Sequence, residues 1–167
     1  ALPKRSLKQA PSSPPRPEPP PPPPVVIHEY RSGDGVGLRS LWDAADFRSL
    51  GDDDASLRTF AQRNPGTFLV AVQGSMIVGS ALGAWDGRRG WIYHVAAAAE
   101  HRRAGLGTRL VRQVEDRLRA LGCRKVNVIV RDGNEAGAAF WRAVGYVRHA
   151  SHQFGRELLD DDQAFGR

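Results

Sequence analysis

The stretch HVAAAAEHRRAGLGTRL, from His94 to Leu110, is the part of this sequence that decides the fold. It begins in an apolar run typical of a strand, passes through a basic, glycine-rich turn and opens a helix. The first turn of a helix presents unpaired amides and a partial positive charge, which together favour phosphate. Gly105 and Gly107 lack the β-carbons that would hold a pyrophosphate away, and Arg102 and Arg103 add charge. The stretch therefore predicts a phosphate-binding turn.

Two other phosphate-binding patterns do not fit this turn. A dinucleotide-binding fold needs a third glycine and a following strand with an acidic residue, and a nucleoside triphosphatase needs Gly-Lys-Ser/Thr. The sequence has neither pattern here. Taken alone, the two glycines are equally compatible with a tight turn beside two solvated arginines. The interpretation therefore depends on the elements around the turn.

The residues before the stretch predict four strands and two helices. A strand is expected at Val25–Tyr30, and a helix carrying Val36, Leu38, Leu41 and Trp42 follows, with Asp34 as a candidate cap. A second helix should begin at Asp52–Asp54 and stop at Asn64, Pro65 and Gly66. Three further apolar runs are Thr67–Val72, Met76–Trp85 and Gly90–Ala97, separated by Gln73-Gly74 and Asp86-Gly87. Such short connections predict an antiparallel meander.

The residues after the turn predict two helices and two or three strands. Leucine and valine recur every three or four positions from Leu106 to Leu121, which indicates a helix closed by Gly122. A strand is expected at Arg124–Val130, then a short helix capped by Asn134 and ended by Gly145, then one or two strands within Tyr146–Leu158. The order β-α-α-β-β-β-α-β-α-β predicts an α/β (α+β) fold, with a mixed, mostly antiparallel sheet of six to seven strands and about four helices.

Composition indicates one domain behind a tail. The chain has 167 residues, 41% apolar and 25% charged, which suits a single soluble domain. Eleven of its twelve prolines lie in residues 1–24, so we expect a disordered or extended tail there and one domain over residues 25–167. No apolar run approaches the roughly 18 residues of a membrane span, and no secretory signal is evident, so no membrane partner and a cytoplasmic location are expected.

The charge and the cysteine content limit the classes of ligand, metal and partner that we expect. The net charge is +6, and the tail contributes half of it, so the basic excess is not concentrated in a folded patch and no nucleic-acid partner is expected. A polyanionic ligand such as coenzyme A suits this balance. Cys123 is the single cysteine, which excludes an internal disulfide and leaves no second thiol for zinc, so no metal is expected. His149 and His152 would point to opposite faces of a strand, which also disfavours a metal site.

The sequence resembles the GNAT superfamily of N-acetyltransferases from Val25 to Leu159. One hallmark, Arg/Gln-x-x-Gly-x-Gly/Ala after the fourth strand, is matched by Arg102, Gly105 and Gly107. Another, an Asn before a short helix that ends in aromatic-x-x-x-Gly-aromatic, is matched by Asn134, Trp141, Gly145 and Tyr146. The segments Trp85–Trp91 and Arg119–Asn134 look closest to a bacterial subgroup with poorly defined substrates, and the chain also resembles the ribosomal-protein-alanine acetyltransferases.

The resemblance implies an acetyl-CoA-dependent enzyme that acetylates a primary amine by direct attack in a ternary complex. Strands 4 and 5 of the sheet would splay apart, and the pantetheine arm would pair with Val95, Ala96 and Ala97. The Val95 amide would also polarise the thioester carbonyl. The remaining coenzyme contacts would come from Arg102, Arg103, Ala104, Gly105, Leu106, Gly107, Thr108, Asn134 and Trp141. Dimers are frequent in similar proteins, so a homodimer is a further expectation.

The catalytic groups of the ribosomal-protein enzymes do not carry over. Their glutamate base falls on Ile129 and their tyrosine acid on Trp141, and an indole does not sensibly give up its proton. Tyr93 and His94 remain as candidates, and alternation along a strand would let only one of them face the cleft. His94 is the candidate base because its charge changes near neutrality, with a packing role as an equal alternative. Glu100 is a weaker candidate that would act through water.

The sequence gives only weak indications of the residues that bind the acceptor. Trp85 and Asp86, with Trp91, are expected to shape the acceptor rim, and core packing of the two indoles is an equal alternative. The acceptor itself is not determined by the sequence. Without an evident base or acid, a coenzyme-binding sensor or interaction module without turnover is the rival interpretation.

Overall fold

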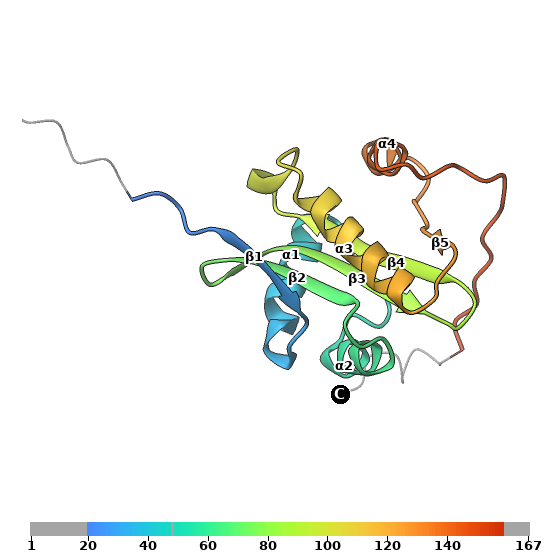
Figure 1. Ribbon diagram of the computed structural model, residues 1–167, viewed down its shortest axis with the longest axis horizontal. Coiled ribbons are helices and arrows are strands. Elements are labelled where there is room, and N and C mark those ends of the chain that lie inside the picture. The colour runs from blue at the N-terminus through green and yellow to red at the C-terminus, as the bar shows by residue number, and fades with distance from the viewer. Residues whose placement is uncertain (1–19, 48, 159–167) are drawn as a thin grey trace, which may run out of the picture.

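The computed structural model describes residues 20–47 and 49–158. Within these residues, five strands form one sheet in the order β1-β2-β3-β4-β5 (Figure 1). They are β1 (Val25–Glu29), β2 (Phe68–Gln73), β3 (Met76–Trp85), β4 (Gly90–Ala97) and β5 (Val126–Asn127). The pairs β1–β2, β2–β3 and β3–β4 are antiparallel, whereas β5 lies parallel to β4. A parallel pair needs a crossover, and a helix supplies it.

Four α-helices cover the two faces of the sheet. They are α1 (Gly35–Ala44), α2 (Asp54–Arg63), α3 (Leu106–Ala120) and α4 (Glu135–Ala143). Strand β2 is buried on both sides: Phe68 and Val70 pack with α1 and α2, whereas Leu69 and Ala71 pack with α3. Alternate residues of a strand point to opposite faces, so the sheet is a central layer between two hydrophobic cores.

This architecture confirms the predicted fold class. Strands β3 and β4 have the predicted bounds, and the β2–β3–β4 meander forms with its two tight turns. Asn134 caps α4 through its side chain, as expected. Asp34 directly precedes α1, but its carboxylate accepts the Arg31 amide in a 3-10 turn, so the predicted side-chain cap of α1 is wrong.

The C-terminal part of the sheet is smaller than predicted. Among the described residues, the sheet has five strands rather than six or seven, β5 covers only two of the seven residues expected, and Tyr146–Leu158 contributes no strand. After α4 the chain runs along the outside of β5 without joining it (Figure 1). Val147 and Phe154 are exposed there, so the segment buries no apolar face that would fix a strand register.

The described part of the proline-rich tail is its last segment, Pro20–Pro24. Residues 1–19 of the predicted tail lie outside the described residues, and Pro20–Pro24 are exposed apart from any helix or strand. The Gln73 side chain donates a hydrogen bond to the Pro23 carbonyl at 2.8 Å. No helix in the described ranges is long and apolar enough to cross a membrane.

Candidate active site

A β-bulge in β4 is the central feature of the site. Ser80 pairs with Ala96 and Leu82 with Tyr93, so His94 and Val95 together oppose the single residue between Ser80 and Leu82. His94 adopts a left-handed backbone with φ of 48°. Such a conformation is uncommon outside glycine, although histidine is among the residues that adopt it more often. The bulge therefore changes the phase of β4 at His94.

The bulge corrects one expectation about the two catalytic candidates. Tyr93 packs edge-on against Phe60 of α2, and His94 packs edge-on against Trp42 of α1. Both rings therefore face the side of the sheet that α1 and α2 cover. The prediction that alternation would send them to opposite faces is wrong, because the extra residue of the bulge interrupts the alternation between Tyr93 and His94.

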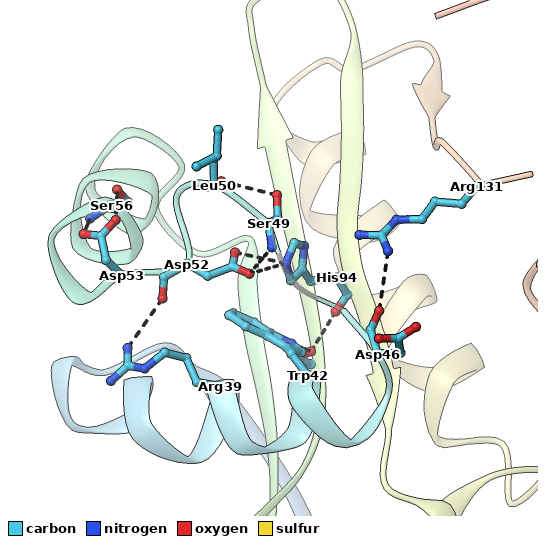
Figure 2. A network of polar contacts seen from close by, with 11 residues as sticks. Arg39, Trp42, Asp46, Ser49, Leu50, Asp52, Asp53, Ser56, His94 and Arg131 are labelled. Atoms are coloured by element: carbon cyan, nitrogen blue, oxygen red, sulfur yellow. Dashed lines mark hydrogen bonds and ion pairs between the residues drawn. The ribbon is translucent and has the colours of Figure 1, made fainter. Parts of the chain in front are cut away.

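The His94 ring is held by a carboxylate from the connection between α1 and α2. Its Nε2 lies 3.0 and 3.2 Å from the two carboxylate oxygens of Asp52 (Figure 2). The Ser49 amide donates to the same carboxylate at 3.0 Å. Both ring and carboxylate are mostly buried, with side-chain exposures of 16% and 18%. This pair stands next to the bulge on the α1 and α2 face.

Hydrogen bonds through Ser80 fix the backbone of His94. Ser80 Oγ donates to the His94 carbonyl at 2.7 Å and accepts the Trp42 Nε1–H at 2.9 Å. Ser80 is fully buried and Trp42 is 1% exposed. The two hydrogen bonds fix the bulge to the core of the α1 and α2 face.

Tyr93 offers a second polar group on the same face. It is 39% exposed and lies parallel to Trp91, with ring centroids 6.4 Å apart. Partial burial, and to a smaller extent the negative charge of Asp86, raises the pKa of the Tyr93 hydroxyl above its usual value. The hydroxyl therefore stays protonated at neutral pH and can donate a hydrogen bond.

The predicted phosphate turn is open. Gly105 directly precedes α3 with φ of 79°, and a β-carbon there would meet nothing within 4 Å. The Arg109 amide makes the first hydrogen bond of the helix, to the Gly105 carbonyl, so the amides of Leu106, Gly107 and Thr108 precede its ladder. Arg102, Arg103, Ala104 and Gly105 are exposed, whereas the Leu106 side chain is buried. The turn has the exposed glycine and leading amides that phosphate requires.

The β4 edge next to this turn is also free. Pairing with β5 is limited to Gly90 and Trp91, so in the described residues the rest of β4 has no partner on that side. This is the predicted separation of the two strands. Val95 and Ala97 pack toward the α3 core, whereas Ala96 belongs to the α1 and α2 core. The Arg102 Nε donates to the Ala97 carbonyl at 3.3 Å, and so occupies one of the expected pantetheine contacts.

Asn134 and Trp141 lie on the α3 side of the sheet, with α4. The Asn134 Oδ1 accepts the Gly137 amide at 2.8 Å, so its oxygen serves the helix cap. Trp141 packs edge-on against Phe140 and Tyr146 and borders the α3 core. Phe140 in turn approaches Gly107, which connects α4 to the phosphate turn.

Trp85 and Asp86 lie apart from His94. Trp85 packs toward the α3 core at the end of β3. Asp86 shapes the β3–β4 turn, because its carboxylate accepts the amides of Arg89 and Arg88 at 2.6 and 2.7 Å, and these bonds lower its pKa. The structure therefore does not bring these two residues to the His94 and Asp52 pair.

The remaining candidates are dispersed. His149 and His152 are both exposed in the segment without a strand, so the argument from strand alternation does not apply to them. In the described ranges no three His, Cys, Asp or Glu side chains cluster in a way that could hold a metal ion. Glu100 is exposed, and Cys123 is half-buried with its Sγ 3.3 Å from the Lys125 carbonyl.

Sequence reasoning missed Asp52 and Ser80 as members of the site. Asp52 was expected only to favour the start of α2, and Ser80 lay in an apolar strand. One signal was available: a helix needs one capping residue, and three consecutive aspartates, Asp52 to Asp54, lie at the start of α2. Asp53 makes that cap, which leaves Asp52 for another role.

Comparisons with known proteins agree on one family. The sequence profile of the Acetyltransferase (GNAT) family matches residues 36–146. An acetyltransferase of Yersinia pestis strain Pestoides F is 31% identical over 140 residues, which cover 83% of this chain and 99% of that protein.

Solved structures show the same fold. Ard1 from Thermoplasma volcanium has a TM-score of 0.68 at 20% identity, covering 75% of this chain and 84% of its own. Naa20 of Chaetomium thermophilum, solved with a bisubstrate analogue, has a TM-score of 0.65 at 23% identity, covering 73% and 70%. The resemblance to the ribosomal-protein subgroup stays a prediction. The phosphate turn, the separated strands and these matches together establish that the chain belongs to the GNAT family and is an acetyltransferase.

Proposed function

We propose that the protein transfers an acetyl group from acetyl-CoA to a primary amine by direct attack in a ternary complex. The observation that carries this proposal is the open turn before α3, where Gly105 and the leading amides of the helix stand beside the free edge of β4. A diphosphate on the turn would place the rest of the coenzyme along that edge. The residues present therefore fit the coenzyme.

Each part of the coenzyme has a place in this arrangement. The amides from Arg103 to Thr108 and the two arginine side chains bind the phosphates. The pantetheine arm follows Val95, Ala96 and Ala97, which requires Arg102 to release the Ala97 carbonyl. Trp141 packs beside the arm, and the Asn134 amide nitrogen is the part of that side chain left to bind it, because its oxygen caps α4.

The residues at the bulge in β4 carry out the chemical step of this proposal. The Val95 amide polarises the thioester carbonyl, whose oxygen gains negative charge as the amine attacks. The attacking amine must be neutral and must lose a proton, and His94 is the candidate base for that step. Tyr93 stands on the same face and supplies a hydrogen-bond donor. Positioning two bound substrates supplies much of the remaining rate.

Two structural relatives support a ternary complex. Chaetomium thermophilum Naa20 was solved with a bisubstrate analogue, and AAC(6')-Iy with the bisubstrate analogue CoA-S-monomethyl-acetylneamine. Such analogues join donor and acceptor in one molecule, which suits an enzyme that binds both before reacting. These relatives support the class of reaction and not one particular amine.

Calorimetry with acetyl-CoA tests the coenzyme site. Gly105→Glu places a carboxylate among the phosphates and should weaken binding at least about tenfold through like-charge repulsion. Gly122→Glu is the matched control, because Gly122 also has a positive φ and open space around it but lies at the other end of α3. Equal affinities for the two variants would contradict the placement.

Turnover separates an enzyme from a coenzyme sensor. Free thiol released from acetyl-CoA should appear with at least one of spermidine, kanamycin, lysine and an alanine-initiated peptide. Mass spectrometry of the acceptor should show one added acetyl group. Tight acetyl-CoA binding without turnover on any of these, or on lysate amines, would favour the sensor instead.

A further inference from the structure

The direction of the Asp52 side chain is not explained by a role in starting α2. Three aspartates precede or begin the helix, and each has a different partner. Asp53 caps α2 by accepting the amides of Ala55 and Ser56, and Asp54 pairs with Arg39 at 2.6 Å. Asp52 instead reaches across to β4, where both of its oxygens lie within 3.2 Å of His94 Nε2 (Figure 2).

His94 is fixed from several sides at once. Trp42 packs edge-on against the ring at a centroid distance of 4.5 Å, and Phe47 lies at 5.9 Å. Ser80 holds the carbonyl of its left-handed backbone. A conformation of this kind costs about 1–3 kcal/mol and persists only where the surroundings over-determine it. Several contacts of the fold therefore fix the orientation of this one mostly buried imidazole.

The carboxylate also decides which ring nitrogen carries the proton. A carboxylate only accepts hydrogen bonds, so the neutral ring donates its Nε2–H to Asp52 and keeps its lone pair on Nδ1. No hydrogen bond to Nδ1 is found among the described residues, and the ring is not completely enclosed. The Nδ1 atom is therefore the one available to take a proton from an acceptor.

The charges around the pair are few. Arg39 approaches the Asp52 backbone carbonyl at 3.5 Å, and Arg131, beyond β5, approaches the Asp46 carbonyl at 3.5 Å. The elements packed directly on the ring contribute aromatic side chains, Trp42 and Phe47, and Tyr93 is its neighbour in β4. Asp52 is thus the one carboxylate in direct contact with His94 in the described part of the chain.

We propose that Asp52 is a positioning residue that holds His94 with its Nε2 protonated, so that Nδ1 removes the proton from the attacking amine. This inference rests on the proposed acetyl transfer. The amine lone pair forms the new C–N bond, and the pair of the breaking C–S bond leaves with the coenzyme sulfur. The surplus proton on nitrogen passes to Nδ1, and the leaving thiolate takes a proton from water. Asp52 balances the positive charge of the resulting imidazolium.

Kinetics of full-length variants test this role with a matched control. Asp52→Asn keeps the size of the side chain and removes its charge, and should lower kcat about 10- to 100-fold, a part of what a general base contributes. The dissociation constant for acetyl-CoA should stay within about twofold, because the coenzyme lies along β4 and the α3 turn. Asp53→Asn removes the same charge one residue away and retains the cap, since asparagine caps as well as aspartate, so its kcat should be unchanged.

If the contact between Asp52 and His94 of β4 served stability alone, the variants would show a different pattern of kcat. For a positioning role, Asp52→Asn should add little to His94→Gln in the double variant, because the two residues act as one unit. Additive effects of the two changes on kcat would overturn the inference.

A measurement on the ring itself separates this inference from the proposed function. In protein labelled with ¹⁵N-histidine, the neutral His94 ring should show its proton on Nε2, and Asp52→Asn should shift it toward a mixture of tautomers. A wild-type ring protonated on Nδ1 would refute the inference whether or not the protein turns over. Absence of turnover on every amine, with the predicted tautomer present, would refute the proposed transfer and with it this role in catalysis.

Discussion

Ser80→Ala is the sharpest test of how the bulge is built. The Ser80 hydroxyl is a relay that donates to the His94 carbonyl at 2.7 Å and accepts from Trp42 Nε1 at 2.9 Å. Losing the hydrogen bond to His94 costs about 1 kcal/mol. The buried Trp42 N–H would also lose its acceptor, which costs about 1–3 kcal/mol more. The variant should therefore lose about 2–4 kcal/mol of its free energy of unfolding.

The partner variant Trp42→Phe makes this reasoning testable. Phenylalanine has no N–H, so in that background Ser80→Ala removes only the bond to His94 and should cost about 1 kcal/mol. The coupling between the two changes should then be about 1–3 kcal/mol. Urea unfolding followed by far-UV circular dichroism gives all four stabilities without relying on tryptophan. A Ser80→Ala cost below about 0.5 kcal/mol, as at an ordinary surface site, or the same cost in both backgrounds, would refute the relay.

Two further variants test the packing and capping that position the site. Gly83→Ala should lower the free energy of unfolding by about 1–3 kcal/mol, because the added β-carbon would lie 2.5 Å from Val114 Cγ1 in the core. Gly33→Ala is the control: a β-carbon there meets open space, so the same urea titration should show almost no change in stability. Asp53→Ala should cost about 1 kcal/mol at neutral pH by removing the α2 cap, and Asp53→Asn much less. Hydrogen bonds from the Ser56 side chain and amide lower the pKa of Asp53 below its usual 3.8. The stability that the Asp53 carboxylate contributes is therefore present above about pH 4, and it is lost as the pH falls through the lowered pKa of the folded protein. Equal acid sensitivity of wild type and Asp53→Ala in thermal melts would contradict that account.

Most of the framework could be predicted because its signals are local. The start of α3 follows from glycines and a periodic apolar face, and the meander follows from two turn signals between apolar runs. Asn134 is a preferred capping residue, and the structure uses it as one. Each of these features is specified within about ten residues of chain, which is the range over which propensity and periodicity act.

The bulge and the Asp52 contact could not be predicted in the same way. A bulge exists only in the pairing of two strands, and the sequence at His94 carries no glycine that would mark it. The contact between Asp52 and His94 joins residues 42 apart and depends on how α1 and α2 pack on the sheet. The missing strands after Tyr146 have a related cause, because their apolar residues find no face of the sheet to cover.

The bulge matters because it separates two tasks along one strand. In a regular strand, Tyr93 would share its face with Val95 and Ala97, and His94 would share its face with Ala96. Here Tyr93, His94 and Ala96 face α1 and α2, while Val95 and Ala97 face α3. Two of the three strand residues proposed to meet the coenzyme, Val95 and Ala97, therefore point toward the side where α3 and its phosphate turn lie. The proposed base points to the other side, and adjacent residues of one strand can thus serve donor and acceptor on opposite faces of the sheet.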